Sequence, residues 1–269
     1  MATKRIGFIG AGRMAQALAA GFRQKGVVTP DLLLASDISP QARERFRATT
    51  GAEVTADNLE VVRRQDVIFL AVKPQYMDEV LRQLAGQLPP DRLVVSIAAG
   101  ISLAKLEAEL GKSCRVIRVM PNTPCLVGQG ASGYALGSCA TDEDGRLVGE
   151  LLSAVGVAVR VEERLMDAVT ALSGSGPAFA YLMLEALTDA GVRHGLPRDT
   201  ARLLAAQTLK GAAEMVLATG SPPSVLKEEV TSPGGTTIAG LAAMESAGFR
   251  GAVFAAVKAA VERSAQLGG

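Results

Sequence analysis

The residues with the clearest chemical use lie close to the start of the chain. Residues 5–15 form an apolar run, a glycine-rich turn and the beginning of a helix-forming stretch. Gly10 allows a tight turn, Gly12 leaves the backbone open to a pyrophosphate, and Ala15 fills the helix-packing position. The free N–H groups of the first helical turn favour a phosphate. A purely structural turn is the alternative, but the strand–turn–helix order favours a dinucleotide-binding loop made by Gly10, Ala11, Gly12, Arg13 and Met14.

A second candidate is the carboxylate of Asp37, which follows Ser36 at the end of a short apolar run. An acidic residue after the second strand of a dinucleotide-binding fold binds the ribose hydroxyls of the adenosine and repels a 2′-phosphate. Asp37 therefore favours NADH, although Arg43 and Arg45 could reach a 2′-phosphate. The alternative for Asp37 is the N-cap of a helix that begins near Pro40.

Three further strand ends carry small, polar or proline residues, which is typical where backbone lies against a flat cofactor. Loop punctuation is the alternative for any one of them. Because the carboxyl ends of parallel strands meet at one edge of a sheet, we expect a shared site there, to which residues 71–74, 97–100 and 120–124 contribute.

Two loops in the second half of the chain combine glycines with hydroxyl side chains just before a helix. Residues 172–178 read Leu-Ser-Gly-Ser-Gly-Pro-Ala, and residues 230–238 read Val-Thr-Ser-Pro-Gly-Gly-Thr-Thr-Ile. Backbone N–H groups in such loops can bind a carboxylate. A capped helix start with a glycine turn is the alternative, but a pair of these loops in one small helical region favours anion binding.

The elements that must position these residues alternate along the first part of the chain. Apolar runs predict strands at 5–9, 32–35, 67–72, 93–97, 115–119, 132–135 and 157–161. Amphipathic stretches predict helices at 13–25, 40–48, 57–64, 76–87, 102–110 and 142–154. This alternation predicts an α/β fold with a Rossmann-type, doubly wound, mainly parallel sheet that is covered on both faces.

The β pattern ends at about residue 162. Beyond it, periodicity predicts helices at 164–172, 177–193, 198–218, 223–230, 236–246 and 249–266. Several of them are apolar nearly all round, which indicates burial against a partner subunit. We therefore expect a dinucleotide-binding domain at 1–162 and an all-α dimerisation and substrate-binding domain at 163–269.

Composition limits the remaining classes. The chain has 269 residues, of which 48% are hydrophobic, and its 28 basic and 27 acidic residues leave a net charge of +1. This balance gives no support for nucleic-acid or membrane-surface binding, and no apolar run is long enough to span a membrane. The three cysteines lack a CxxC spacing and His194 is the single histidine, so we expect free thiols and no metal. An early first strand leaves no room for a signal peptide, and we expect a cytoplasmic location.

Six stretches carry a resemblance to a known family, namely residues 7–15, 71–74, 96–100, 120–124, 173–178 and 232–237. In their order and spacing they resemble the pyrroline-5-carboxylate reductases over nearly the whole chain, and the last stretch is the most specific. The resemblance implies that NADPH or NADH reduces the cyclic imine 1-pyrroline-5-carboxylate to L-proline, the last step of proline biosynthesis. It also implies homodimers of interlocked helical domains, which often assemble into decamers, with the substrate loop serving the partner's site.

The resemblance further implies roles for single residues. Backbone N–H groups of Gly235, Thr236 and Thr237 would hold the substrate carboxylate, with the Thr237 hydroxyl near the ring nitrogen. Glu163 would lie beside the substrate. Asn58 would contact the adenosine half of the cofactor, and the nicotinamide half would be contacted by Ala71, Val72, Lys73, Pro74, Ala98 and Ala99. The family often has Arg, Ser or Thr where this chain has Asp37, which bears on coenzyme preference and not on the reaction.

The sequence contains no apparent His–Asp–Ser relay, and His194 lies in a polar connection between helices. A cyclic imine can accept its proton before hydride arrives, so the reaction needs positioning and dry surroundings more than a strong acid. A β-hydroxyacid dehydrogenase is one alternative, but those enzymes use a lysine on the long helix after the Rossmann domain, and residues 177–192 contain none. A non-catalytic nucleotide-sensing regulator is the other, and it would tolerate loss of the Gly-Gly-Thr-Thr loop, which is intact here.

Overall fold

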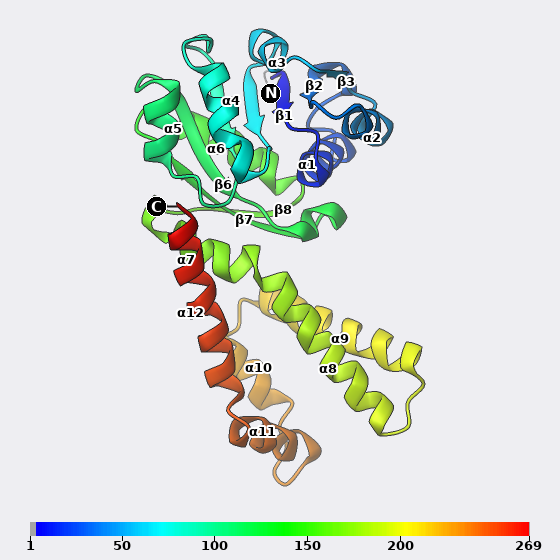
Figure 1. Ribbon diagram of the computed structural model, residues 1–269. Coiled ribbons are helices and arrows are strands. Elements are labelled where there is room, and N and C mark those ends of the chain that lie inside the picture. Colours follow the sequence, from blue (N-terminus) through cyan, green and yellow to red (C-terminus); the bar gives the residue numbers. More distant parts are fainter. Residues whose placement is uncertain (1–3, 269) are drawn as a thin grey trace. The chain divides into compact units, whose positions relative to one another are not determined.

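A computed structural model describes residues 4–268 and contains an eight-stranded sheet (Figure 1). The strand order is β3-β2-β1-β4-β5-β6-β7-β8. From β1, the next two strands are added on one side, and β4 and the later strands are added on the other side. Neighbouring strands from β3 to β6 are parallel, whereas β7 runs antiparallel to β6 and parallel to β8. The strands are β1 (Ile6–Ile9), β2 (Leu33–Ser36), β3 (Glu53–Thr55), β4 (Val67–Leu70), β5 (Leu93–Ser96), β6 (Arg115–Met120), β7 (Gly130–Leu136) and β8 (Gly156–Arg160).

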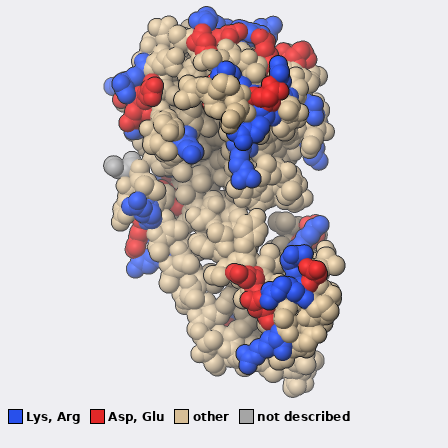
Figure 2. All heavy atoms as spheres, turned by 45° about the vertical axis from the view of Figure 1, so that its right-hand side comes forward, with Lys and Arg blue, Asp and Glu red and all other residues tan. Residues whose placement is uncertain are grey.

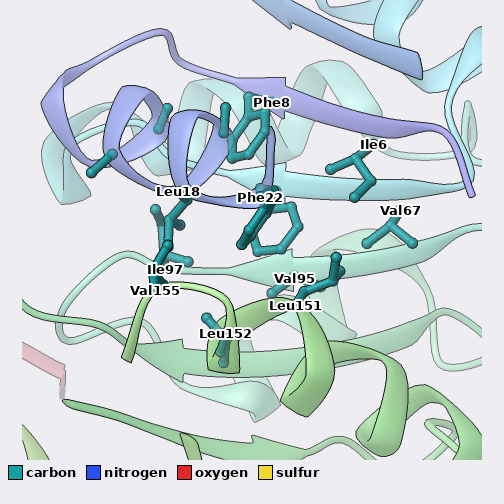
Figure 3. Close-up of a cluster of buried hydrophobic side chains, with 14 of the residues drawn as sticks. Ile6, Phe8, Leu18, Phe22, Val67, Val95, Ile97, Leu151, Leu152 and Val155 are labelled. Atoms are coloured by element: carbon teal, nitrogen blue, oxygen red, sulfur yellow. The ribbon is translucent and has the colours of Figure 1, made fainter. Parts of the chain in front are cut away.

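Helices cover both faces of the sheet because its central strands are apolar on both sides. On one face, Phe8 and Phe69 stack with ring centroids 5.0 Å apart. Phe8 also packs against Phe22 of α1 (Figure 3). On the other face, Ile68 and Leu70 belong to a separate buried cluster. The helices of this part are α1 (Arg13–Gln24), α2 (Pro40–Thr50), α3 (Asn58–Arg64), α4 (Met77–Leu84), α5 (Leu103–Leu110) and α6 (Asp142–Ser153). The predicted doubly wound, mainly parallel sheet is confirmed.

One strand and one helix differ from the prediction. The sequence analysis missed β3, because this edge strand has only β2 beside it and its residues are exposed or half-buried, so no apolar run marks it. The predicted helix at 164–172 is instead a short α-helix, α7 (Met166–Val169), that widens into a π-helical turn over Thr170–Gly174. Such π turns are rare in proteins and frequently mark functional sites.

The chain divides into two compact units. One comprises the residues up to Ser175 together with those from Ala260 onward, and the other comprises Gly176–Ala259. The second unit is helical throughout its regular structure, with α8 (Gly176–Arg193) packed beside α9 (Arg198–Thr219), followed by α10 (Pro223–Glu229) and α11 (Thr236–Ser246). The last helix, α12 (Phe249–Gly268), contributes residues to both units. Within residues 4–268, no helix combines the length and apolar character needed to cross a membrane.

The helical unit leaves large apolar side chains uncovered in the single chain. Leu182 of α8, Leu203 of α9 and Phe254 of α12 are 67%, 70% and 78% exposed. On the face drawn in Figure 2, uncharged surface lies between the clusters of charged side chains. Exposed apolar side chains of this size favour a protein–protein interface, which agrees with the expectation from the nearly all-apolar helices.

Candidate functional site

The glycine-rich turn after β1 has the geometry that the sequence predicted. Gly10 adopts φ +99°, and a Cβ atom there would lie 2.8 Å from the backbone carbonyl of Ala71. The Gly10 N–H donates to Ser36 O at 2.8 Å. A Cβ atom at Gly12, in contrast, would have no neighbour within 4 Å. The turn is therefore packed where it meets the sheet and open at Gly12, where a pyrophosphate needs access.

The start of α1 presents unsatisfied N–H groups. Gly12 is the N-cap and makes no side-chain capping bond. Ala11 is fully buried, and its carbonyl accepts a 2.8 Å hydrogen bond from Gln16 Nε2, which holds the turn against the helix. Arg13 is exposed and Met14 is half-buried. The positive end of the α1 dipole and its open amides are thus suited to a phosphate.

Asp37 lies directly beside this turn. Its Oδ2 accepts from Ala11 N at 2.9 Å and its Oδ1 accepts from Ser39 N at 2.8 Å. The N-cap of α2 is Ser39, whose side chain accepts from Ala42 N, so the alternative role of Asp37 as N-cap is wrong. The carboxylate therefore adjoins the glycine turn, where the ribose of a bound dinucleotide is expected.

The two arginines that could serve a 2′-phosphate differ in their contacts. Arg43 Nη1 donates to the carbonyl of Asp37 at 2.6 Å and to that of Ile38 at 3.3 Å. Arg45 is exposed on α2. Nη1 of Arg43 is consequently engaged in holding the loop after β2.

Asn58, at the start of α3, reaches the same edge of the sheet. Its Oδ1 accepts from Ser36 Oγ at 2.6 Å, and its Nδ2 donates to Gln83 Oε1 at 2.8 Å. Ser36 is fully buried, so its hydroxyl is oriented by the surrounding protein groups and does not reach solvent. The structure thus brings Asn58 and Ser36 together at the carboxyl end of β2.

The next strand ends meet the glycine turn in register. Ala71 N donates to Ile9 O at 2.8 Å, and Ile97 N donates to Leu70 O at 3.1 Å, which continues the ladders past β4 and β5. Residues 71 and 72 are half-buried and residues 73 and 74 are exposed, whereas Ala98 is buried and Ala99 half-buried. Small residues at these ends leave a flat backbone surface for a ring.

Sequence reasoning did not single out Asn122, which joins two of the expected loops. Its side chain is 7% exposed. Its Nδ2 donates to Ser173 O at 3.0 Å, and its Oδ1 accepts from Ala131 N at 2.9 Å. The loop at 172–178 is therefore tied to the end of β6 through its π turn, in which Ser173 Oγ donates to Val169 O. The position of Asn122 between two prolines was the only signal in the sequence, and it does not indicate which distant residues the side chain contacts.

Glu163 is engaged with protein groups in this structure. Its Oε1 accepts from the backbone N–H of Leu103, the first residue of α5, at 2.6 Å. The same oxygen accepts from Arg118 Nη1 at 3.2 Å. Arg118 is 8% exposed, and the sequence analysis did not identify it.

The second glycine–hydroxyl loop lies in the helical unit and starts α11. Gly234 adopts φ +68°, and Gly235 is the N-cap without a side-chain capping bond. Ser232 lies so close to Gly235 that any Cβ atom there would overlap its Oγ. Thr236 and Thr237 then open an 11-residue helix. The Gly235 N–H donates to Ser232 O at 3.1 Å in this structure, so the amides of Thr236 and Thr237 are the ones that favour a carboxylate, which agrees with the anion-binding interpretation.

The cysteines are free, and two of them are poor nucleophiles. Burial raises the pKa of the Cys114 thiol to about 11 and raises that of Cys125 as well. Both thiols are protonated at neutral pH, whereas the thiolate is the reactive form. Among the described residues, no group of three or more His, Cys, Asp or Glu side chains is arranged to hold a metal ion.

The two glycines of the turn should respond differently to alanine. Gly10→Ala is expected to destabilise the fold by about 2 kcal/mol or more, because φ is positive there and the methyl group would press on Ala71. Gly12→Ala should leave the melting temperature nearly unchanged but weaken coenzyme binding by about tenfold, because the methyl group occupies the approach path of the pyrophosphate. Thermal unfolding and coenzyme titration of both variants check this; equal coenzyme affinity in Gly12→Ala would contradict it.

The doubly wound sheet, the open glycine turn and the acidic residue after β2 define a dinucleotide-binding protein of the oxidoreductase class. Residues 5–100 match the family model described as NADP oxidoreductase, coenzyme F420-dependent, and residues 163–267 match the model described as pyrroline-5-carboxylate reductase dimerisation. The chain belongs to the pyrroline-5-carboxylate reductase family, whose members are NAD(P)H-dependent oxidoreductases.

Relatives match this chain over its whole length. The pyrroline-5-carboxylate reductase of Methanosarcina acetivorans is 48% identical over 100% of this chain and 99% of its own, and that of Arabidopsis thaliana is 46% identical over 98% of this chain and 95% of its own. The crystal structure of a Plasmodium falciparum pyrroline carboxylate reductase with NADP bound superposes with a TM-score of 0.90 at 36% identity and covers 100% of both chains. The predicted family, fold class, enzyme class and NAD(P)H cofactor are confirmed.

Proposed function

We propose that this chain reduces 1-pyrroline-5-carboxylate to L-proline with the glycine turn after β1 and the amides at the start of α11 as its two binding elements. The observation that carries the proposal is the start of α11, where Gly235 caps the helix without a side chain and leaves its first amides unsatisfied. The substrate of this family has a single carboxylate, and such amides bind a carboxylate. The chain holds both elements in separate units.

The coenzyme half of the site is proposed on the sheet edge. Gly10, Ala11, Gly12, Arg13 and Met14 would hold the pyrophosphate, because the open Gly12 and the start of α1 favour an anion. Ser36, Asp37 and Asn58 would bind the adenosine half. The nicotinamide half would lie against residues 71–74 and against Ala98 and Ala99, where the small side chains of the three alanines suit a flat ring.

The substrate half is proposed around Thr237. Backbone N–H groups of Gly235, Thr236 and Thr237 would bind the carboxylate, and the Thr237 hydroxyl would donate to or accept from the ring nitrogen and so fix the face presented for reduction. Glu163, which the family resemblance places beside the substrate, would act from the short helical turn after β8, where it accepts from Leu103 N. When bound, the reduced nicotinamide supplies the hydride; the chain's own residues bind, orient and exclude water.

Coenzyme preference is proposed to favour NADH. The Asp37 carboxylate adjoins the glycine turn, and Arg43 is held by backbone carbonyls of the same loop. A 2′-phosphate would therefore meet the negative charge of Asp37.

The assembly proposed is a homodimer through the helical unit, with decamers as a further possibility of the family. The dimerisation model that matches residues 163–267 and the exposed apolar side chains of α8, α9 and α12 support oligomerisation. In such a dimer the α11 loop of one subunit would serve the coenzyme domain of its partner. Free cysteines support a cytoplasmic location.

The proposal is tested by mixing the purified protein with pyrroline-5-carboxylate and either NADH or NADPH. Loss of dihydronicotinamide absorbance with stoichiometric formation of proline is the expected result, at a higher kcat/KM with NADH. A β-hydroxyacid substrate oxidised with NAD would instead favour the dehydrogenase alternative, although α8 offers no lysine for it. Coenzyme binding without turnover of either substrate would favour a nucleotide-sensing regulator.

A further inference from the structure

The end of the last helix lies against the loop proposed to contact the nicotinamide. Gly100 adopts φ +75°, and a Cβ atom there would lie 3.2 Å from the backbone carbonyl oxygen of Leu267 in the last turn of α12. Both residues belong to the compact unit that contains the sheet. The backbone at the end of α12 thus packs directly against the loop after β5.

A chain of polar contacts makes a second connection between the same two elements. Ser264 of α12 is 6% exposed, and its Oγ donates to Asp167 Oδ1 at 2.7 Å. Asp167 Oδ1 lies 3.9 Å from Arg118 Nη2, and Arg118 Nη1 lies 3.2 Å from Glu163 Oε1. Glu163 in turn accepts from Leu103 N at 2.6 Å. Leu103 begins α5, directly after the loop at 97–102.

This series of polar contacts depends on the buried charge of Arg118. Arg118 projects from the middle of β6 and is 8% exposed, so its charge has little access to water and depends on its two carboxylate partners. Removing one partner of a buried ion pair leaves an uncompensated charge that drives local rearrangement. A change at Ser264 alters the hold on Asp167 and is therefore transmitted through Arg118 and Glu163 to the start of α5.

We infer that the carboxyl-terminal turns of α12 position the nicotinamide loop, and that Ser264 is a positioning residue for hydride transfer. The inference rests on the proposed function through the assignment of Ala98 and Ala99 to the nicotinamide. It extends that proposal, because Ser264 is bonded to Asp167, which the proposal assigns neither to the coenzyme nor to the substrate. Since α12 also contributes residues to the helical unit, the same helix joins the dimerisation part of the chain to the coenzyme loop.

The test compares Ser264→Ala with Ser264→Thr, which retains the hydroxyl, and with Gln266→Ala, an exposed position two residues further along α12. We expect Ser264→Ala to lower kcat by about tenfold and to raise the KM for coenzyme, because small displacements of a reacting group cost that much or more. The primary isotope effect with coenzyme deuterated at nicotinamide C4 should rise, since hydride transfer becomes slower. Ser264→Thr should restore all three quantities, and Gln266→Ala should match wild type.

A second variant distinguishes a loss of positioning from a general loss of folding. Asp167→Asn retains an oxygen acceptor for Ser264 but removes the charge that faces Arg118, and it should shift the same kinetic quantities in the same direction. Kinetics equal to wild type in both Ser264→Ala and Asp167→Asn would overturn the inference, as would a drop in melting temperature with an unchanged isotope effect. If wild type itself fails to reduce pyrroline-5-carboxylate, the proposed function fails separately. The positioning role is then judged by NADH titration, in which weaker binding to Ser264→Ala than to Gln266→Ala supports it and equal binding overturns it.

Discussion

Replacing Asp37 with serine is expected to change the ratio of kcat/KM for NADPH to that for NADH by about a hundredfold in favour of NADPH. The reason is charge. The Asp37 carboxylate lies 2.9 Å from Ala11 N at the edge of the glycine turn, where the adenosine ribose is expected. Apposed like charges cost several kcal/mol, and a hundredfold ratio corresponds to about 2.7 kcal/mol. Steady-state kinetics with both coenzymes at saturating pyrroline-5-carboxylate measure the effect.

The matched control for this change is Asp37→Asn. Asp37 accepts from Ala11 N and from Ser39 N with its two separate oxygens, whereas asparagine has the same shape, carries no charge and keeps one oxygen that can accept from one of these two groups. If charge sets the preference, Asp37→Asn should recover most of the shift toward NADPH while losing little activity with NADH. A wild-type protein that already prefers NADPH, with no change in Asp37→Asn, would show that Asp37 does not discriminate between the coenzymes. Arg43 would then be the next residue to replace, because its guanidinium contacts the same loop.

Replacing Thr237 with alanine should lower kcat/KM for pyrroline-5-carboxylate by about 10- to 1,000-fold, with coenzyme affinity little changed. Thr237 is the second residue of α11, half-buried, and follows the uncapped Gly235. Its amide and its hydroxyl are assigned different tasks: the amide binds the carboxylate and the hydroxyl orients the ring nitrogen. Alanine removes only the hydroxyl, so the loss measures the orientation of the ring. Initial-rate kinetics in substrate, with a separate coenzyme titration, give both quantities.

Two further variants separate shape from hydrogen bonding at this position. Thr237→Ser keeps the hydroxyl and should retain most of the wild-type rate. Thr237→Val keeps the branched shape without the hydroxyl and should behave like Thr237→Ala. Wild-type kcat/KM in Thr237→Val would show that the hydroxyl has no role in turnover, and the proposal would then depend on the backbone amides alone.

The local parts of the site were accessible from sequence because neighbouring residues determine them. Gly10 and Gly12 take their conformations from a turn between one strand and the next helix, and Gly234 with Gly235 does the same at the start of α11. Strand and helix periodicity likewise marks most of the sheet, since buried strands are apolar on both faces. These features need only a few consecutive residues, so their positions could be predicted without knowledge of the fold.

The tertiary structure decided which distant side chains meet. Asn58 reaches Ser36, Asn122 reaches Ser173, and Arg118 lies between Glu163 and Asp167, although no spacing in the sequence indicates these pairs. The sequence also gave no sign that β7 pairs antiparallel with β6 or that Arg43 donates to the carbonyl of Asp37. Each depends on how strands are ordered in the sheet and on which charges become buried together. Those outcomes follow from the free energy of the whole packed chain and not from any local pattern of residues.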